Sequence, residues 1–173
     1  MLIQKDKSSL IIIDVQEKLV SAMPKPYKFI DNIIKLQKAA NILRVPCIFS
    51  EQYPKGLGKT INKIKENMSY KNSIIEKTDF SVPIANLSEH CIICGIEAHV
   101  CILQTAIELA DNKKKVYVVQ DAISSRYEKD YLTALSRLDK HPNIQIVSCE
   151  MVLFEWLRSS DHPEFKAISL LIK

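Results

Sequence analysis

The chain has 173 residues and is 47% hydrophobic, with 7 Pro and 3 Gly, so it has the size of one ordinary domain and enough apolar side chains for a core. This composition excludes a disordered tail, a collagen and a linker-rich assembly. The 24 Lys and Arg against 20 Asp and Glu leave a net charge of +4, which favours no particular partner. We expect a single domain over residues 1–173 that binds no nucleic acid.

Hydropathy argues against a membrane protein. The longest apolar runs, Leu10 to Ile13 and Cys91 to Cys94, are far shorter than the roughly 20 residues that a membrane span needs. Residues Met1 to Lys7 carry charge where a signal peptide needs an apolar stretch. The 5 cysteines cannot all pair within the chain, so free thiols in a reducing compartment are the expectation. We therefore predict a cytoplasmic protein without membrane contact.

Short apolar runs alternate with longer amphipathic stretches along the chain. The runs are typical of strands buried on both faces, at Leu10 to Ile13, Pro46 to Ser50, Ser73 to Ile75, Cys91 to Cys94, Lys115 to Gln120 and Ile144 to Ser148. The stretches predict helices at Tyr27 to Leu43, Ala98 to Ala110, Glu128 to Lys140 and Met151 to Arg158. Between Glu51 and Tyr70 we expect a loop with a short helix. This order predicts a three-layer α/β/α fold, Rossmann-like and doubly wound, around a six-stranded parallel sheet.

Three chemically useful side chains follow predicted strands. Asp14 comes directly after the first strand, Lys77 soon after the third, and Cys101 lies six residues after Gly95 at the end of the fourth. In open α/β sheets the ligand binds beyond the carboxyl ends of the strands, so these groups are expected to converge. Each alone is usually a helix cap, a surface ion pair or a small buried hydrophobe, but their coincidence favours a functional site.

The position of Cys101 predicts a nucleophile. It falls near the start of a predicted helix, where unpaired N–H groups lower the pKa of a thiol and favour the thiolate. Helical spacing places it on the more polar side with Gln104, Thr105 and Glu108. A nearby lysine can stabilise the thiolate, and an aspartate can take the thiol proton and later deliver it to the leaving group.

Several segments resemble the isochorismatase-like cysteine hydrolases, and most closely the branch of isochorismatase domain-containing proteins. Four of them carry the signature: Leu10 to Lys18, Glu51 to Gly58, Lys77 to Ser81 and Gly95 to Cys101. Two later segments, Asp121 to Arg126 and Phe165 to Ser169, are also similar, so the resemblance spans nearly the whole chain in one order.

This resemblance implies the isochorismatase-like hydrolase fold and a catalytic triad of Asp14, Lys77 and Cys101. It also implies a non-proline cis peptide at Ile96–Glu97, which would aim the N–H groups of Glu97 and Cys101 at the substrate oxygen as an oxyanion hole. A homo-oligomer is implied as well. Residues placed after strand ends are expected to line a substrate pocket, and they are Gln52, Tyr53, Phe80 and Glu97.

Two departures narrow the expected reaction. Nicotinamidases of this superfamily carry an Asp-x-His metal motif after the second strand, whereas this chain reads Ser50-Glu51-Gln52-Tyr53 there. We therefore expect no metal and no other cofactor. True isochorismatases generally lack the cysteine, because hydrolysis of a vinyl ether needs an acid rather than a nucleophile. Cys101 thus indicates attack on a small amide, imide or related carbonyl compound.

Rival interpretations of the same residues are weaker. Cys91 and Cys94 form a C-x-x-C within a strand, where residues three apart face opposite sides, so neither a redox dithiol nor a zinc site is expected. His99 lies two residues before Cys101, and such helical positions do not face each other. The alternative that stays open is a weakly active or non-catalytic scaffold of the same fold.

Overall fold

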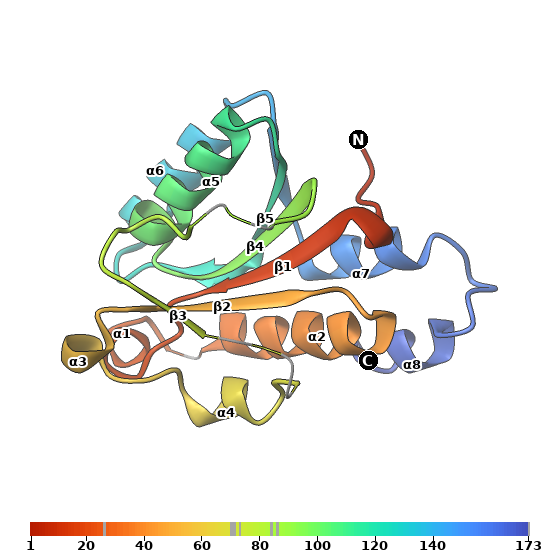
Figure 1. The fold of residues 1–173 in the computed structure, drawn as a ribbon, viewed down its shortest axis with the longest axis horizontal. Coiled ribbons are helices and arrows are strands. Elements are labelled where there is room, and N and C mark those ends of the chain that lie inside the picture. Colours follow the sequence, from red (N-terminus) through yellow and green to blue (C-terminus); the bar gives the residue numbers. More distant parts are fainter. Residues whose placement is uncertain (26, 70–71, 73, 84, 86, 173) are drawn as a thin grey trace.

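The computed structural model describes residues 1–25, 27–69, 72, 74–83, 85 and 87–172. Six strands form one parallel sheet, as predicted, and their order in the sheet is β3-β2-β1-β4-β5-β6 (Figure 1). The chain runs from β1 outward to β3 and then returns to the other side of β1 with β4, so the strand order reverses between β1 and β4. Their bounds are β1 Ser8–Ile13, β2 Cys47–Gln52, β3 Ile74–Lys77, β4 His90–Ile96, β5 Lys115–Ser124 and β6 Ile144–Val147.

Helices cover both faces of the sheet, which gives the three layers (Figure 1). The α-helices are α1 Glu17–Ser21, α2 Lys28–Leu43, α3 Pro54–Leu57, α4 Asn62–Lys65, α5 Leu103–Asp111, α6 Glu128–Leu138, α7 Cys149–Leu157 and α8 Phe165–Ser169. A 3-10 turn, η1 (Lys5–Lys7), precedes β1, and a π-helical turn, η2 (Ala98–Ile102), precedes α5. Across the part of the chain that the structure describes, every helix is too short or too polar to span a bilayer.

Alternation along the strands divides the core between the two faces of the sheet. Leu10 and Ile12 of β1 pack into the cluster beneath α2 and α7, whereas Ile11 and Ile13 pack into the cluster beneath α5 and α6. Every residue of β1 is buried, which explains its apolar composition.

Several element bounds differ from the sequence prediction. Strand β5 extends to Ser124, past the expected end at Gln120, and its register with β4 shifts between Ile93, which pairs with Val118, and Gly95, which pairs with Ile123. The predicted helix from Ala98 begins with a π turn, so α5 starts only at Leu103. Strand β3 runs to Lys77, and Ser73, where this strand was expected to start, lies outside the described residues.

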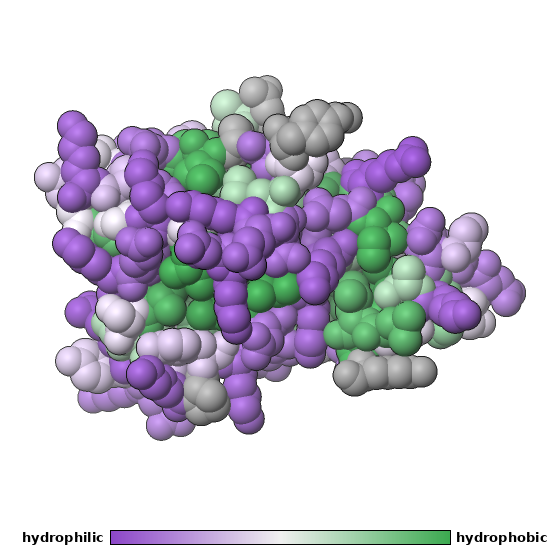
Figure 2. All heavy atoms as spheres, turned by 90° about the horizontal axis from the view of Figure 1, so that it is seen from below, coloured by the Kyte–Doolittle hydropathy of each residue, from purple (hydrophilic) through white to green (hydrophobic). Residues whose placement is uncertain are grey.

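The apolar side chains of the final segment pack mainly on the body of the molecule. Ile168 is fully buried, and Phe165, Leu171 and Ile172 pack against the cluster that includes α2 and α7, while Leu170 stays exposed. Seen from the side of α2, α4 and α8, apolar surface gathers toward α8 (Figure 2).

Gly95 allows β4 to approach β1 closely. Its φ is +120°, and a Cβ built there would lie 2.1 Å from the Ile13 carbonyl oxygen and 2.7 Å from the Ile13 nitrogen. Only glycine fits this conformation and this spacing. The contact brings the end of β1, which carries Asp14, beside the end of β4.

We predict that Gly95→Ala destabilises the fold by at least about 2 kcal/mol, since rigid backbone must move and a side chain is strained at this φ. Chemical denaturation measures the loss. The matched control is Cys94→Ala, a truncation at the neighbouring buried strand position that adds no Cβ against β1. Equal stability of Gly95→Ala and the wild type would contradict the argument.

Candidate active site

Asp14 is a buried carboxylate at the end of β1. Its backbone has the left-handed conformation, with φ 52°, and its N–H donates to the Ser50 carbonyl of β2 at 3.1 Å. The Ser50 hydroxyl donates to Asp14 Oδ1 at 2.7 Å. The side chain of Asp14 is 0% exposed, so this carboxylate depends on protein donors instead of water.

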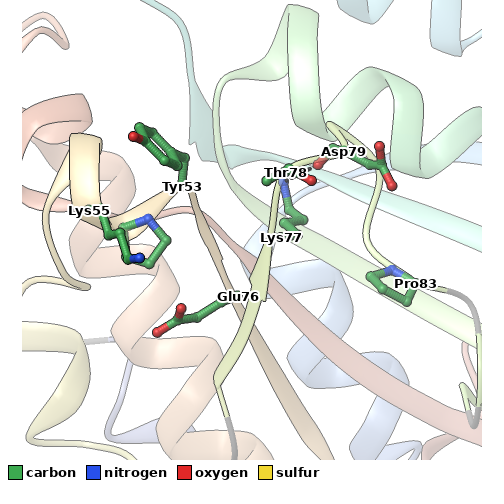
Figure 3. Close-up of a pocket in the computed structure, with 8 residues that line it drawn as sticks. Tyr53, Lys55, Glu76, Lys77, Thr78, Asp79 and Pro83 are labelled. Atoms are coloured by element: carbon green, nitrogen blue, oxygen red, sulfur yellow. Dashed lines mark hydrogen bonds between the residues drawn. The ribbon is translucent and has the colours of Figure 1, made fainter.

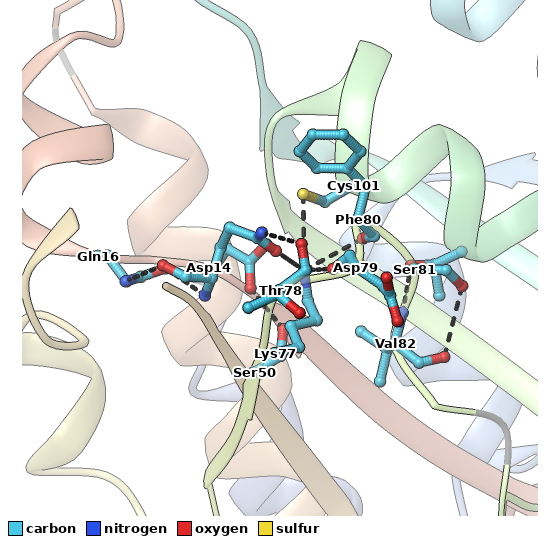
Figure 4. A network of polar contacts seen from close by, with 12 residues as sticks. Asp14, Gln16, Ser50, Lys77, Thr78, Asp79, Phe80, Ser81, Val82 and Cys101 are labelled. Carbon is cyan, nitrogen blue, oxygen red and sulfur yellow. Dashed lines mark hydrogen bonds and ion pairs between the residues drawn. The ribbon is translucent and has the colours of Figure 1, made fainter. Parts of the chain in front are cut away.

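Lys77, the last residue of β3, places its ammonium at the centre of the site (Figure 4). Nζ lies 2.8 Å from Asp14 Oδ2 and 2.7 Å from Gln52 Oε1. It also contacts the carbonyl oxygens of Asp79 and Phe80 at 3.3 and 3.1 Å, and Cys101 Sγ at 3.6 Å. The Lys77 side chain is only 4% exposed. The structure thus brings together the acid, the amine and the thiol that the sequence singled out.

The environment of Cys101 differs from the expected one. The residue lies within the π turn and belongs to the apolar cluster beneath α5 and α6, with 6% of its surface exposed. Burial raises the pKa of the thiol to about 12, and the charge of Asp14 adds to this effect while Lys77 opposes it. The expectation that the thiolate is favoured at this position was therefore wrong, because burial and the charge of Asp14 outweigh the opposing charge of Lys77. The placement of Cys101 on a polar side with Thr105 was also wrong, since Thr105 is buried.

The Ile96–Glu97 peptide bond, which connects β4 to the π turn, is cis. The Glu97 side chain points away from the triad contacts toward the loop after β5, where Oε2 accepts hydrogen bonds from Arg126 N at 3.0 Å and Arg126 Nε at 3.1 Å. Glu97 is 7% exposed and the Arg126 side chain 50% exposed.

The residues expected to line a pocket have different roles. Gln52 is buried, accepts from Lys77 and donates to the Thr78 carbonyl at 2.6 Å, so it orients the ammonium. Tyr53 is exposed and lines a cavity of about 480 Å³ whose lining includes Lys77 but neither Asp14 nor Cys101 (Figure 3). Phe80 contributes its carbonyl to Lys77, and its ring is half exposed.

The sequence argument missed two supporting residues, Ser50 and Gln16. Gln16 Nε2 donates to the carbonyls of Gln52 and Gly58, and Gln16 Oε1 accepts from Gln52 N at 2.8 Å (Figure 4). Gln16 thereby ties the end of β2 to the loop after α3. The available signal was a polar residue at or just beyond the end of an apolar strand, which Ser50 and Gln16 share with Asp14.

His99 and the remaining cysteines lie apart from the triad contacts. His99 Nδ1 is 3.0 Å from Ser125 Oγ, and its contacts, with the loop after β5 and the start of α6, do not include Cys101. Cys91 and Cys94 pack into opposite clusters, as expected from the strand alternation. Cys47 and Cys149 are buried in the core. Within the described residues, no group of three or more His, Cys, Asp and Glu is placed to hold a metal ion.

Comparison with known proteins identifies the fold and family. The sequence model of the isochorismatase domain matches residues 8–150. The chain belongs to the isochorismatase family. This family member is 34% identical over 174 residues to isochorismatase domain-containing protein 2 of Danio rerio, covering 95% of this chain and 86% of the relative.

Solved structures agree with that assignment. A structure described as the MAR1 ribonuclease of Caenorhabditis elegans superposes with a TM-score of 0.94 and 36% identity, covering 99% of this chain and 92% of the other. The YcaC protein of Escherichia coli, described as an octameric hydrolase of unknown specificity, has a TM-score of 0.88 at 20% identity, covering 99% and 89% of the two chains. The isochorismatase family member therefore has the isochorismatase-like hydrolase fold.

Two substitutions are predicted to shift the pKa of Cys101 in opposite directions. Asp14→Asn removes a negative charge that raises the pKa of the thiol, so this pKa falls and more thiolate exists at a given pH. Lys77→Met removes the cation that lowers it, so the pKa rises. We expect the midpoint of the pH dependence of iodoacetamide alkylation at Cys101, mapped by mass spectrometry, to lie at lower pH in the first variant and at higher pH in the second than in the wild type.

Lys114→Met is the matched control, because it removes a cation that acts on Cys91 instead. A midpoint that lies at higher pH in Asp14→Asn than in the wild type would contradict the assignment of Asp14 as a charge beside the thiol.

Proposed function

We propose that the chain is a cysteine-dependent hydrolase that acts on a small amide, imide or related carbonyl compound through Asp14, Lys77 and Cys101. The observation that carries the proposal is the position of Lys77 Nζ, which contacts Asp14 Oδ2 at 2.8 Å and Cys101 Sγ at 3.6 Å in a buried site. An acid and a thiol that both contact one fixed cation are the groups that nucleophilic acyl transfer needs.

The resting thiol is protonated at neutral pH, because its pKa is raised to about 12. Attack must therefore be coupled to loss of the proton. As the sulfur–carbon bond forms, Asp14 accepts the thiol proton and the carbonyl electrons move to oxygen. The backbone N–H groups of Glu97 and Cys101 are the proposed donors to that oxyanion. Asp14 then protonates the leaving nitrogen as the carbon–nitrogen bond breaks, which leaves a thioester.

Water completes the cycle. The oxygen of a water molecule attacks the thioester carbon while Asp14 removes a proton from that water. The carbon–sulfur bond then breaks, and the Cys101 thiolate takes the proton back from Asp14. Lys77 keeps one positive charge beside both groups throughout, so the negative charge that passes between Asp14 and sulfur always has a neighbouring cation. Gln52 and two carbonyl oxygens hold the ammonium in place.

The residues of the site also distinguish the proposed reaction from vinyl ether hydrolysis and from metal-dependent nicotinamide hydrolysis. Hydrolysis of a vinyl ether needs no nucleophile, whereas here the thiol contacts the ammonium directly. A metal-dependent nicotinamidase needs histidine ligands around the end of β2, where this chain has Glu51, Gln52 and Tyr53. Glu51 accepts from Thr60 N and Oγ1 at 2.7 and 2.8 Å, which gives it a structural role.

The proposal includes a homo-oligomer and a cytoplasmic location. The octameric state described for YcaC supports the first. The 5 cysteines are all free and buried, which is consistent with a reducing compartment.

A screen of small amides and imides for ammonia or amine release tests the function. We predict that Cys101→Ala abolishes turnover, and that Asp14→Asn lowers kcat by roughly 100-fold or more, as is typical when a general base is lost. Cys149→Ala is the matched control, a buried thiol in the other cluster. Near wild-type turnover in Cys101→Ala would exclude the covalent mechanism.

The same proteins should be incubated with RNA, because one similar structure is described as a ribonuclease. RNA cleavage by the wild type that persists in Cys101→Ala would favour a nucleolytic function. If no amide or imide is hydrolysed and Cys101 is alkylated no faster than the other thiols, the scaffold alternative is supported.

We also predict that a strong chelator leaves the rate of hydrolysis unchanged, since the proposed triad acts without a metal. The measurement compares initial rates before and after dialysis against the chelator. Loss of activity that returns with zinc, iron or manganese would instead favour a metal-dependent reaction.

A further inference from the structure

The residues that precede η1 are held against the amino ends of the strands by β4 and α7. The Gln4 N–H donates to Nδ1 of His90, the first residue of β4, at 3.0 Å. The Ile3 N–H donates to Oε2 of Glu155 in α7 at 2.6 Å. Ile3 is 0% exposed, so these contacts hold an apolar side chain in the core. Because His90 pairs with Ser8 at the start of β1, they lie at the end of the sheet opposite to the triad.

The bond to Gln4 requires a neutral His90. A ring nitrogen accepts from an N–H only if it carries no proton, so the proton of this imidazole lies on Nε2. The His90 side chain is 0% exposed, and its Nε2 has no hydrogen-bond partner among the described residues. The Glu89 carboxylate lies 3.9 Å from Nε2, which is beyond the reach of a hydrogen bond. The observed contact therefore exists in only one protonation state of the ring.

A second proton on His90 would be placed badly. It would sit on Nδ1, where two N–H groups would then face each other without an acceptor. The titratable and charged groups around the ring come from four parts of the chain, and they are Lys7 of η1, Glu89 before β4, Lys115 and Tyr117 of β5, and Arg158 after α7. Cations thus outnumber acids there, and Glu89 already accepts from Lys115 at 2.6 Å.

Burial lowers the pKa of His90, and the charge of Lys115 adds to this effect. Lys7 and Arg158 act in the same direction, whereas Glu89 opposes them. The environment therefore disfavours the same protonated state that the bond to Gln4 excludes.

We propose that the bond between His90 and Gln4 is a pH-sensitive latch, which opens when His90 is protonated and releases residues 1–4 from the sheet. Release exposes Ile3 and frees the hydroxyl of Tyr117, which donates to the Met1 carbonyl at 3.2 Å in the closed state. Strand β1 stays in place, because β2 and β4 pair with it on both sides. The latch is independent of the proposed function, since it involves none of the triad residues.

The direction of the pH dependence follows from the buried neutral ring. In the released state His90 regains an ordinary pKa of about 6.5, and in the closed state its pKa is lower. Opening therefore takes up one proton between these two values. The latch is closed above about pH 6.5, and its opening constant rises by up to about tenfold for each pH unit below that value.

Hydrogen exchange of backbone amides, measured by NMR on the whole chain, tests the latch. We expect the protection of the Gln4 amide, relative to its intrinsic exchange at each pH, to fall by up to about tenfold per unit below about pH 6.5. The amide of Ile11 in the middle of β1 is the internal reference and should keep its protection. The NMR signals of the Gln4 amide and the His90 ring should titrate with one common midpoint.

Three variants assign the proton to a residue. His90→Asn keeps an acceptor close to the position of Nδ1 and cannot be protonated, so the pH dependence should disappear. Glu155→Gln keeps an acceptor for the Ile3 N–H and removes the other titratable partner of the segment, so the pH dependence should remain. His99→Gln is the matched control, a histidine beyond the opposite end of β4, and should also retain it.

Constant protection of Gln4 down to about pH 5 would overturn the proposal, because an ordinary histidine is protonated there. A pH dependence that persists in His90→Asn or disappears in Glu155→Gln would overturn it as well. If His90→Asn does not fold, the wild-type titration decides alone. Protonation of His90 while the Gln4 amide stays protected, or loss of protection at Ile11 with the same midpoint, would show that no local latch exists.

Discussion

The buried ammonium of Lys77 is the interaction on which the site depends. It joins the end of β1, the end of β2, the loop after β3 and the π turn, which are far apart in the sequence. Burying a charge costs several kcal/mol unless it is paired, and removing one partner of a buried pair costs about 3 to 5 kcal/mol. Asp14 and Gln52, with the backbone carbonyls, meet this requirement. The same contacts that make the charge tolerable also place the acid beside the thiol.

A second constraint lies at the reversal of the strand order. In a doubly wound sheet, the loops after the two central strands diverge to opposite faces and leave a crevice at their carboxyl ends. Here those strands are β1 and β4, and Gly95 lets their backbones approach so closely that no side chain fits between them. Asp14 comes directly after β1 in the chain, and the cis peptide Ile96–Glu97 lies at the end of β4. The fold thus places the acid and the peptide that precedes the thiol at one edge.

The protonated state of Cys101 gives this site a particular character. In the proposed mechanism the buried thiol becomes a strong nucleophile only as Asp14 takes its proton, whereas a thiolate would be present before the substrate binds. The low exposure of Cys101 also limits its reaction with solvent oxidants.

The sequence alone determined the order of strands and helices, because period and residue type report which segments are buried. It also indicated Asp14, Lys77 and Cys101, because polar residues at the ends of apolar strands meet at one edge of a parallel sheet. Only the tertiary structure decided the depth of Cys101, the π turn and the direction of the Glu97 side chain. Each depends on burial and on partners distant in the chain, such as Asp14 for the thiol and Arg126 for the carboxylate. Local sequence does not show which distant residues will bury a side chain and replace the water around it.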